Sequence, residues 1–150
     1  MKGKRVACLL RVATGGLFAF SGWSKLTRPV QEFQYAMEQY QLFSALATRI
    51  ISEFLPWFEL VLGTFLILGF LRKISAVLLS LLNIGFLTVL ISALIRGIDV
   101  ANCGCFGESI HLTLPQAVAF DSGLLAALLF LTLCRENSFE LDAWIQKKSL

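Results

Sequence analysis

Charged residues are scarce in this chain. Only 15% of its 150 residues are Asp, Glu, Lys or Arg, whereas soluble domains carry about 25%. Hydrophobic residues make up 57% of the chain, and the mean hydropathy is +0.74. This composition excludes an ordinary soluble domain and indicates a membrane protein. We therefore expect a lipid bilayer around the chain, and the formal net charge of +3 gives no reason to expect a nucleic-acid partner.

Charge is almost absent from four runs long enough to cross a hydrocarbon core, which needs about 20 mostly apolar residues. In lipid the backbone must satisfy its own hydrogen bonds, so each run is expected to be a helix. The sequence thus predicts an all-α membrane protein, with residues 1–150 forming a single four-helix transmembrane domain. The predicted spans and their charges are Val6–Trp23 with Arg11, Phe54–Leu71 with Glu59, Ile74–Ile95 with none, and Leu114–Cys134 with Asp121.

The first run has a second interpretation, as a cleaved secretory signal. Basic residues precede it, and small residues near Ala19 resemble a cleavage site. However, the apolar run is longer than a usual signal core and contains Arg11. We expect the first span to be retained, and its small residues Gly15, Ala19 and Gly22 predict a face that another helix can approach closely.

The longest connection between spans runs from Pro29 to Ser52. Within it Phe33, Met37 and Tyr40 recur at helical spacing, and the acidic residues of this segment lie off that stripe. This pattern predicts a short amphipathic helix at the membrane interface, after the first span. The next span is expected to begin near Phe54, which would place Pro56 in its first turns.

The distribution of Lys and Arg predicts the orientation of the chain. With the N-terminus inside, eight basic residues fall on the cytoplasmic side and four on the outer side. The positive-inside rule then favours a multi-pass protein of the bacterial cytoplasmic (inner) membrane with both termini in the cytoplasm. The connection between the third and fourth spans is consequently predicted to be extracytoplasmic.

Cysteine is also scarce, but two of the four cysteines stand one glycine apart in that connection, NCGCFGES (residues 102–109, the Cys-Gly-Cys loop). Residues two apart in an extended chain have Cα atoms about 6.6 Å apart, near the upper end of the disulfide range. Gly104 can shorten that distance. A disulfide between Cys103 and Cys105 would be strained, and strained, exposed disulfides are the more exchangeable ones. The pair is therefore predicted to carry thiol–disulfide exchange.

Other roles for these cysteines remain open at this point. The pair could be a purely structural turn, or Cys103 and Cys105 could hold a soft metal with His111. Three ligands fall short of the four of a structural zinc site, so a metal site is not the preferred interpretation. Cys8 and Cys134 are expected to be small packing residues.

The charges inside the predicted spans form a second candidate site. Glu59 and Asp121 are expected at one depth, roughly 8 to 10 Å beneath the outer surface and under the Cys-Gly-Cys loop. Charges in a bilayer usually face the bundle and are candidate functional residues. The carboxylates could join helices by pairing with Lys25 or Arg96, or could move the protons of thiol chemistry. Arg11 is expected to extend toward the cytoplasm.

Three motifs and one acidic position give the chain a resemblance to the MauE and DoxX-like family of four-span membrane proteins. The resemblance implies a redox-associated membrane protein, a possible component of a thiol–disulfide oxidoreductase system, acting beside a thioredoxin-like extracytoplasmic partner. For the MauE type it implies support for maturation of methylamine dehydrogenase. Related chains are linked to quinones, but no quinone signature and no other cofactor motif is visible. The matching segments are RVATGGLFAFSGWSKL, LPWFELVLGTFLILG, CGCFGE and Asp121 in the last span.

Two other classes of function compete with the redox interpretation. A metal-handling membrane protein would use Cys103, Cys105 and His111 as ligands. A non-catalytic assembly factor would use its helix faces and would tolerate the loss of both loop cysteines.

Overall fold

The computed structural model describes residues 2–40, 42, 44–97 and 113–133. All regular elements within these residues are helices. Four of them are long and apolar enough to cross a membrane, as the sequence predicted, and they fit a multi-pass membrane protein. The helices are α1 (Lys2–Leu26), α2 (Val30–Gln39), α3 (Ala45–Leu68), α4 (Arg72–Ile95) and α5 (Leu114–Leu133).

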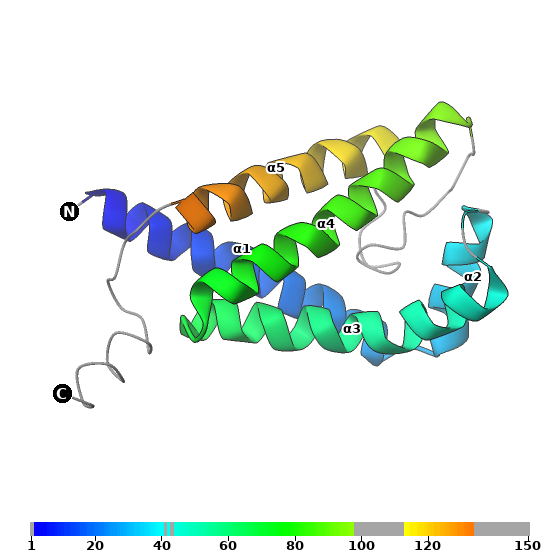
Figure 1. Cartoon of the computed structure of the whole chain (residues 1–150), viewed down its shortest axis with the longest axis horizontal. Helices are drawn as coiled ribbons and strands as arrows, with labels where there is room; N and C mark the ends of the chain where they lie inside the picture. Colours follow the sequence, from blue (N-terminus) through cyan, green and yellow to red (C-terminus); the bar gives the residue numbers. More distant parts are fainter. Residues whose placement is uncertain (1, 41, 43, 98–112, 134–150) are drawn as a thin grey trace.

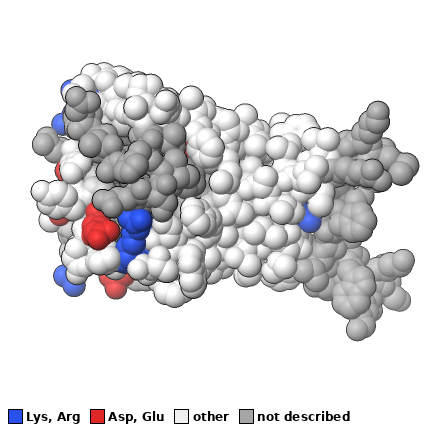
Figure 2. All heavy atoms as spheres, turned by 180° about the vertical axis from the view of Figure 1, so that it is seen from behind, with Lys and Arg blue, Asp and Glu red and all other residues white. Residues whose placement is uncertain are grey.

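The four long helices form an antiparallel bundle in two closely packed pairs. Helix α1 lies beside α3, and α4 lies beside α5 (Figure 1). Helices α1 and α4 run in one direction and α3 and α5 in the other, so α1 begins at the same end of the bundle where α5 stops (Figure 1). Short α2 lies at the opposite end. Seen from behind, the described charges gather mainly at the α2 end, and the middle of this face is uncharged (Figure 2).

Glycines bring α1 and α3 into backbone contact. A Cβ atom built on Gly63 of α3 would lie 2.7 Å from the backbone nitrogen of Ala19 and 2.8 Å from the carbonyl oxygen of Gly15. A Cβ atom on Gly22 of α1 would lie 2.6 Å from the carbonyl oxygen of Pro56. These distances are too short for any side chain. The close-approach face predicted for the first span is therefore confirmed, with α3 as its partner.

Helix α3 begins earlier than the sequence predicted. It starts at Ala45 rather than near Phe54, and its N-cap residue Ser44 accepts a hydrogen bond from the backbone N–H of Ala47. The added turns place Thr48 and Ser52 inside the bundle. An apolar run marks only the uniformly hydrophobic part of such a helix, so the amphipathic first turns were missed. The placement of Pro56 in the first turns was wrong, because Pro56 lies well inside α3.

The short helix predicted between the first two long ones is present as α2. Met37 and the adjoining Tyr40 are buried, in agreement with the apolar stripe of the sequence. The guanidinium of Arg96, just after α4, donates a hydrogen bond of 3.1 Å to the carbonyl oxygen of Tyr40. This bond ties the end of α2 to the end of α4. The location of α2 at a membrane interface stays a prediction.

The core is divided into two apolar clusters with polar side chains between them. Along α4, Asn83 lies between Leu79 of one cluster and Leu90 of the other, and along α5, Asp121 lies between Leu124 and Ala117. The larger cluster draws on all four long helices and joins Phe18, Leu62, Leu66, Ala76, Leu79, Leu124 and Leu128.

The glycine contact yields a direct test. Gly63→Ala should lower the free energy of unfolding by about 1–3 kcal/mol, since the new methyl group meets backbone atoms that cannot yield. Gly16→Ala is the matched control, because a Cβ atom there has no neighbour within 4 Å. Thermal unfolding of both variants in detergent measures the difference. Equal stability of the two variants would contradict the contact.

Candidate functional site

A buried ion pair joins α1 and α3. The ammonium nitrogen of Lys25 lies 2.8 Å from Oε1 and 2.7 Å from Oε2 of Glu59, and it donates to both oxygens. Both side chains are almost inaccessible, with 3% and 1% of their surface exposed. Removing two charges from water is costly, and their attraction repays this only with good geometry and further hydrogen bonds. The surrounding contacts show how those requirements are met.

Ser21 completes the hydrogen bonding of the pair. Its hydroxyl accepts from the Lys25 ammonium at 3.0 Å and donates to Glu59 Oε2 at 3.2 Å. Ser21 precedes Lys25 by one helical turn, so both side chains lie on the same face of α1. The three donors of the Lys25 ammonium are thereby matched by two carboxylate oxygens and one hydroxyl oxygen.

Two aromatic rings enclose the Lys25 ammonium. Its nitrogen lies 5.3 Å from the ring centre of Phe33 on α2 and 5.0 Å from that of Phe86 on α4. A cation within about 6 Å of an aromatic face is attracted by the ring, more strongly when water is excluded. Lys25 thus connects four of the five described helices through one ammonium group.

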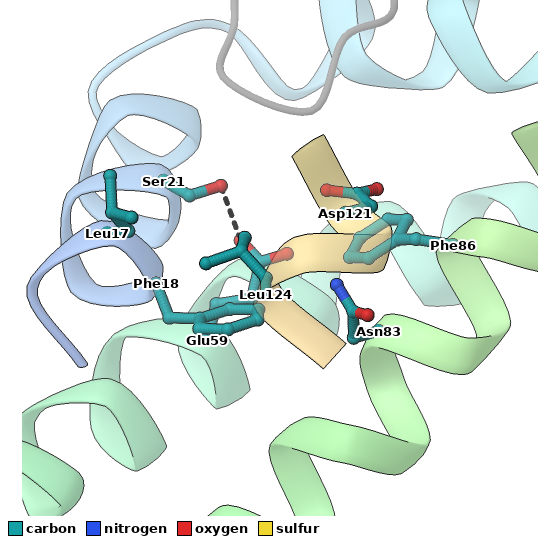
Figure 3. Close-up of a pocket in the computed structure, with 8 residues that line it drawn as sticks. All are labelled: Leu17, Phe18, Ser21, Glu59, Asn83, Phe86, Asp121 and Leu124. Atoms are coloured by element: carbon teal, nitrogen blue, oxygen red, sulfur yellow. Dashed lines mark hydrogen bonds between the residues drawn. The ribbon is translucent and has the colours of Figure 1, made fainter. Parts of the chain in front are cut away.

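A second carboxylate faces this ion pair from α5. Asp121 and Glu59 line one small cavity of about 20 Å³, together with Ser21 and Asn83 on the polar side. Figure 3 shows these polar side chains entering the same space from four helices. Its apolar walls are Leu17, Phe18, Phe86 and Leu124. We call Ser21, Lys25, Glu59, Asn83 and Asp121 the polar cluster.

The structure confirms that Glu59 and Asp121 come together at one level of the bundle. It also identifies the partner of Glu59 as Lys25, one of the two cations considered; Arg96 bonds to the Tyr40 carbonyl instead. Arg11 is 6% exposed and lies inside the bundle, so the expectation that it extends out of the bundle was wrong.

Sequence reasoning missed Ser21 and Asn83. Asn83 had a detectable signal, because an amide in the middle of a charge-free apolar run costs free energy unless it is bonded inside the bundle. Ser21 had a weaker one, its position one turn before Lys25. Neither residue carries a charge, so the charge pattern of the spans does not indicate them.

The predicted sulfur site lies elsewhere in the chain. Cys103 and Cys105, with His111 and Cys134, lie outside the described residues. Among the residues that the structure describes, Cys8 is a free cysteine of intermediate exposure. The described part of the chain also contains no group of three His, Cys, Asp or Glu side chains placed to hold a metal ion.

A family model described as methylamine utilisation protein MauE matches residues 3–134, a range that includes the polar cluster and the Cys-Gly-Cys loop. The chain belongs to the MauE family. Comparisons with curated proteins and with solved structures gave no match. Membership of the MauE family, together with the four apolar helices, indicates a membrane protein linked to methylamine utilisation.

In this MauE chain the polar cluster lies near the helix ends that carry the Cys-Gly-Cys loop. The preceding helix stops at Ile95 and the following helix starts at Leu114, both at the α2 end of the bundle (Figure 1). Asp121 is two turns into α5, about 10 Å from its first residue at 1.5 Å per residue. The loop therefore joins the bundle close to the buried carboxylates.

Breaking the buried pair should be more costly than removing it. Lys25→Met leaves Glu59 without its cation and should lower the free energy of unfolding by about 3 kcal/mol or more. The double variant Lys25→Met with Glu59→Gln should recover much of that loss, because no uncompensated charge remains.

Chemical unfolding of the purified protein in detergent measures both effects. Lys73→Met is the matched control, since Lys73 is an exposed lysine on α4. A Lys25→Met variant as stable as Lys73→Met would show that the ion pair contributes nothing to the fold.

Proposed function

We propose that this MauE protein carries out thiol–disulfide exchange through Cys103 and Cys105 and thereby supports disulfide formation or maturation of exported proteins. Within methylamine utilisation, the corresponding client is methylamine dehydrogenase. The proposed setting is the bacterial inner membrane, with both termini in the cytoplasm and the Cys-Gly-Cys loop outside. The proposed partner is a thioredoxin-like extracytoplasmic protein.

One observation favours this function over a purely structural role. A bundle that needed only to pack would gain by filling its interior with apolar side chains, because buried ion pairs are often no better than a hydrophobic replacement. Instead, two carboxylates, an amide and a hydroxyl line one cavity near the ends of the helices that carry the loop, and an ammonium is bonded to one of those carboxylates. Polar groups kept inside a membrane bundle commonly serve ion or proton pathways.

The proposed exchange has two balanced halves. The reduced pair first attacks the disulfide of the thioredoxin-like partner: one thiolate forms a mixed disulfide, and the second thiol displaces the partner. The partner receives two electrons and two protons, and Cys103 and Cys105 become a disulfide. That disulfide then accepts two electrons and two protons from the dithiol of an exported protein. The carboxylate pair of Glu59 and Asp121 is proposed to hold one proton between these halves.

The cysteines can be tested by trapping. In intact cells, Cys103→Ser should leave a mixed disulfide on Cys105, or Cys105→Ser one on Cys103, since the resolving thiol is gone. Non-reducing gels with mass spectrometry identify the linked protein, which should be extracytoplasmic. The double serine variant should lose both the adduct and the maturation activity.

Cys8→Ser supplies the control for this experiment, because it removes a cysteine from α1 and leaves the loop unchanged. It should trap nothing and retain maturation of exported disulfide proteins. Full maturation in the double serine variant would reject the exchange role and favour a non-catalytic assembly factor. Labelling of the loop cysteines only from the cytoplasmic side would falsify the proposed orientation.

A further inference from the structure

The cavity beside Asp121 contains hydrogen-bond acceptors that lack donors. Asn83 Oδ1 and Asp121 Oδ2 are both buried, and neither has a hydrogen-bond partner among the residues that the structure describes. Asn83 is 1% exposed and Asp121 is 5% exposed, so bulk water does not supply the missing donors. Buried acceptors without donors are rare in native proteins and call for an explanation.

The charges in the polar cluster do not balance either. Lys25 and Glu59 neutralise each other across their short hydrogen bonds. Asp121 adds a second carboxylate to the cavity that Glu59 lines. If every group were ionised, the cluster would carry one uncompensated negative charge inside an apolar bundle, which is strongly unfavourable.

The other arginines of α1, α3 and α4, and Arg96 just after α4, lie several turns along the helix from the polar cluster, are bonded elsewhere or are exposed. On α1, Arg11 precedes Lys25 by four helical turns, about 21 Å. On α4, Arg72 precedes Asn83 by three turns, about 16 Å, and Arg96 is bonded to a backbone carbonyl near α2. Arg49 of α3 is exposed.

The other two helices contribute no Lys or Arg within their described residues. Helix α2 contains only the acidic charges Glu32 and Glu38, and Asp121 is the sole charge on α5. Between these helices, Arg28 pairs with Glu32 at 4.0 Å. Lys25 is thus the one cation that the described helices place beside Asp121, and we look for the missing positive charge in the cavity itself.

We propose that the cavity binds one exchangeable proton and one water molecule, with the proton on Asp121 and the water linking its carboxyl group to Asn83 Oδ1. The proton turns Asp121 into a donor and makes the polar cluster neutral. The water accepts from Asp121 and donates to Asn83, so both unsatisfied acceptors are accounted for. A volume of about 20 Å³ is enough for one water molecule, which needs about 10–15 Å³ and two to four polar partners.

This inference refines the proton role proposed above for the two carboxylates and divides that role between them. Glu59 stays ionised as the counter-ion of Lys25, whereas Asp121 alone gains and releases the proton. The proton count follows from neutrality: it equals the number of carboxylates minus the number of cations in the cluster. Each substitution then has a definite expected result.

Infrared spectroscopy counts the protons directly, because a protonated carboxyl group has a carbonyl stretching band that a carboxylate lacks. The full chain in lipid nanodiscs at neutral pH should show one such band, shifted on exchange into D₂O. Asp121→Asn should abolish it. Glu59→Gln should abolish it as well, because Asp121 then becomes the counter-ion of Lys25 and gives up its proton.

The decisive variant is the combination of Glu59→Gln with Lys25→Met. It removes the whole ion pair and leaves Asp121 without a cation, so the band should return at its original intensity. A band belonging to Glu59 could not return in this protein. The matched control is Glu53→Gln, which changes an exposed carboxylate on α3, the helix of Glu59. It should leave the band unchanged.

Asn83→Leu tests the water bridge. It removes the amide but not the carboxyl group, so the band should remain and shift in frequency as the hydrogen bonding of the carboxyl group changes. The inference is overturned if the wild-type protein lacks the band, if the band survives Asp121→Asn, or if the double variant fails to restore it. An unshifted band in Asn83→Leu overturns the water bridge.

These outcomes are independent of the sulfur chemistry. The infrared band reports on Asp121 whether or not the loop cysteines exchange, and the trapping experiment reports on the cysteines whatever the protonation of Asp121. If no mixed disulfide is trapped but the infrared band behaves as expected, only the exchange function is rejected. If the mixed disulfide is trapped but the band is absent, only the proton site is rejected.

Discussion

The ion pair between Lys25 and Glu59 is the interaction on which the interior of this bundle depends. It joins the two helices that pack most closely, and its ammonium also contacts aromatic rings from two further helices. Because both charges are withdrawn from solvent, every nearby group must either complete the hydrogen bonding of the pair or remain compatible with its charge. Ser21 does the first. Asp121 is a second carboxylate beside a pair that is already neutral. An ionised Asp121 would leave a buried negative charge without a cation, and the proposed protonation of the cavity follows from this.

The backbone contact between α1 and α3 makes this pair geometrically possible. Gly22 lies against the carbonyl of Pro56 and the backbone nitrogen of Leu60, so the two helix axes approach closely at the level of Glu59. A bulkier residue at Gly22 would separate the helices and lengthen the ion pair. In a membrane, small residues favour helix association by permitting close packing; here they also set the distance between two charges.

The long helices could be predicted from the sequence because each crosses an apolar environment and carries the corresponding run of residues. The start of α3 could not, since its first turns expose one face and bury Thr48 and Ser52, a pattern that a search for uniform hydrophobicity does not detect. Helical rise predicted that Glu59 and Asp121 lie at one depth, but that they line the same cavity depends on how α3 and α5 face each other and could not be predicted. The choice of Lys25 over Arg96 depended on the path of α2 and could not be decided from spacing. Asn83 carries no charge and was overlooked.

The polar cluster lies between two apolar clusters, and this layering fixes how the helices can slide against one another. A shift of α4 by one turn would move Asn83 into an apolar cluster and bring a leucine against the carboxylates. Both changes would be unfavourable, because a polar group would lose its polar surroundings and an apolar one would face charges. A purely apolar bundle has many nearly equivalent alignments in lipid. Here the hydrophilic contacts of the polar cluster favour one alignment, so an insertion or deletion in α4 or α5 between the cluster and the helix end that joins the loop would change the distance from that end to the acidic groups.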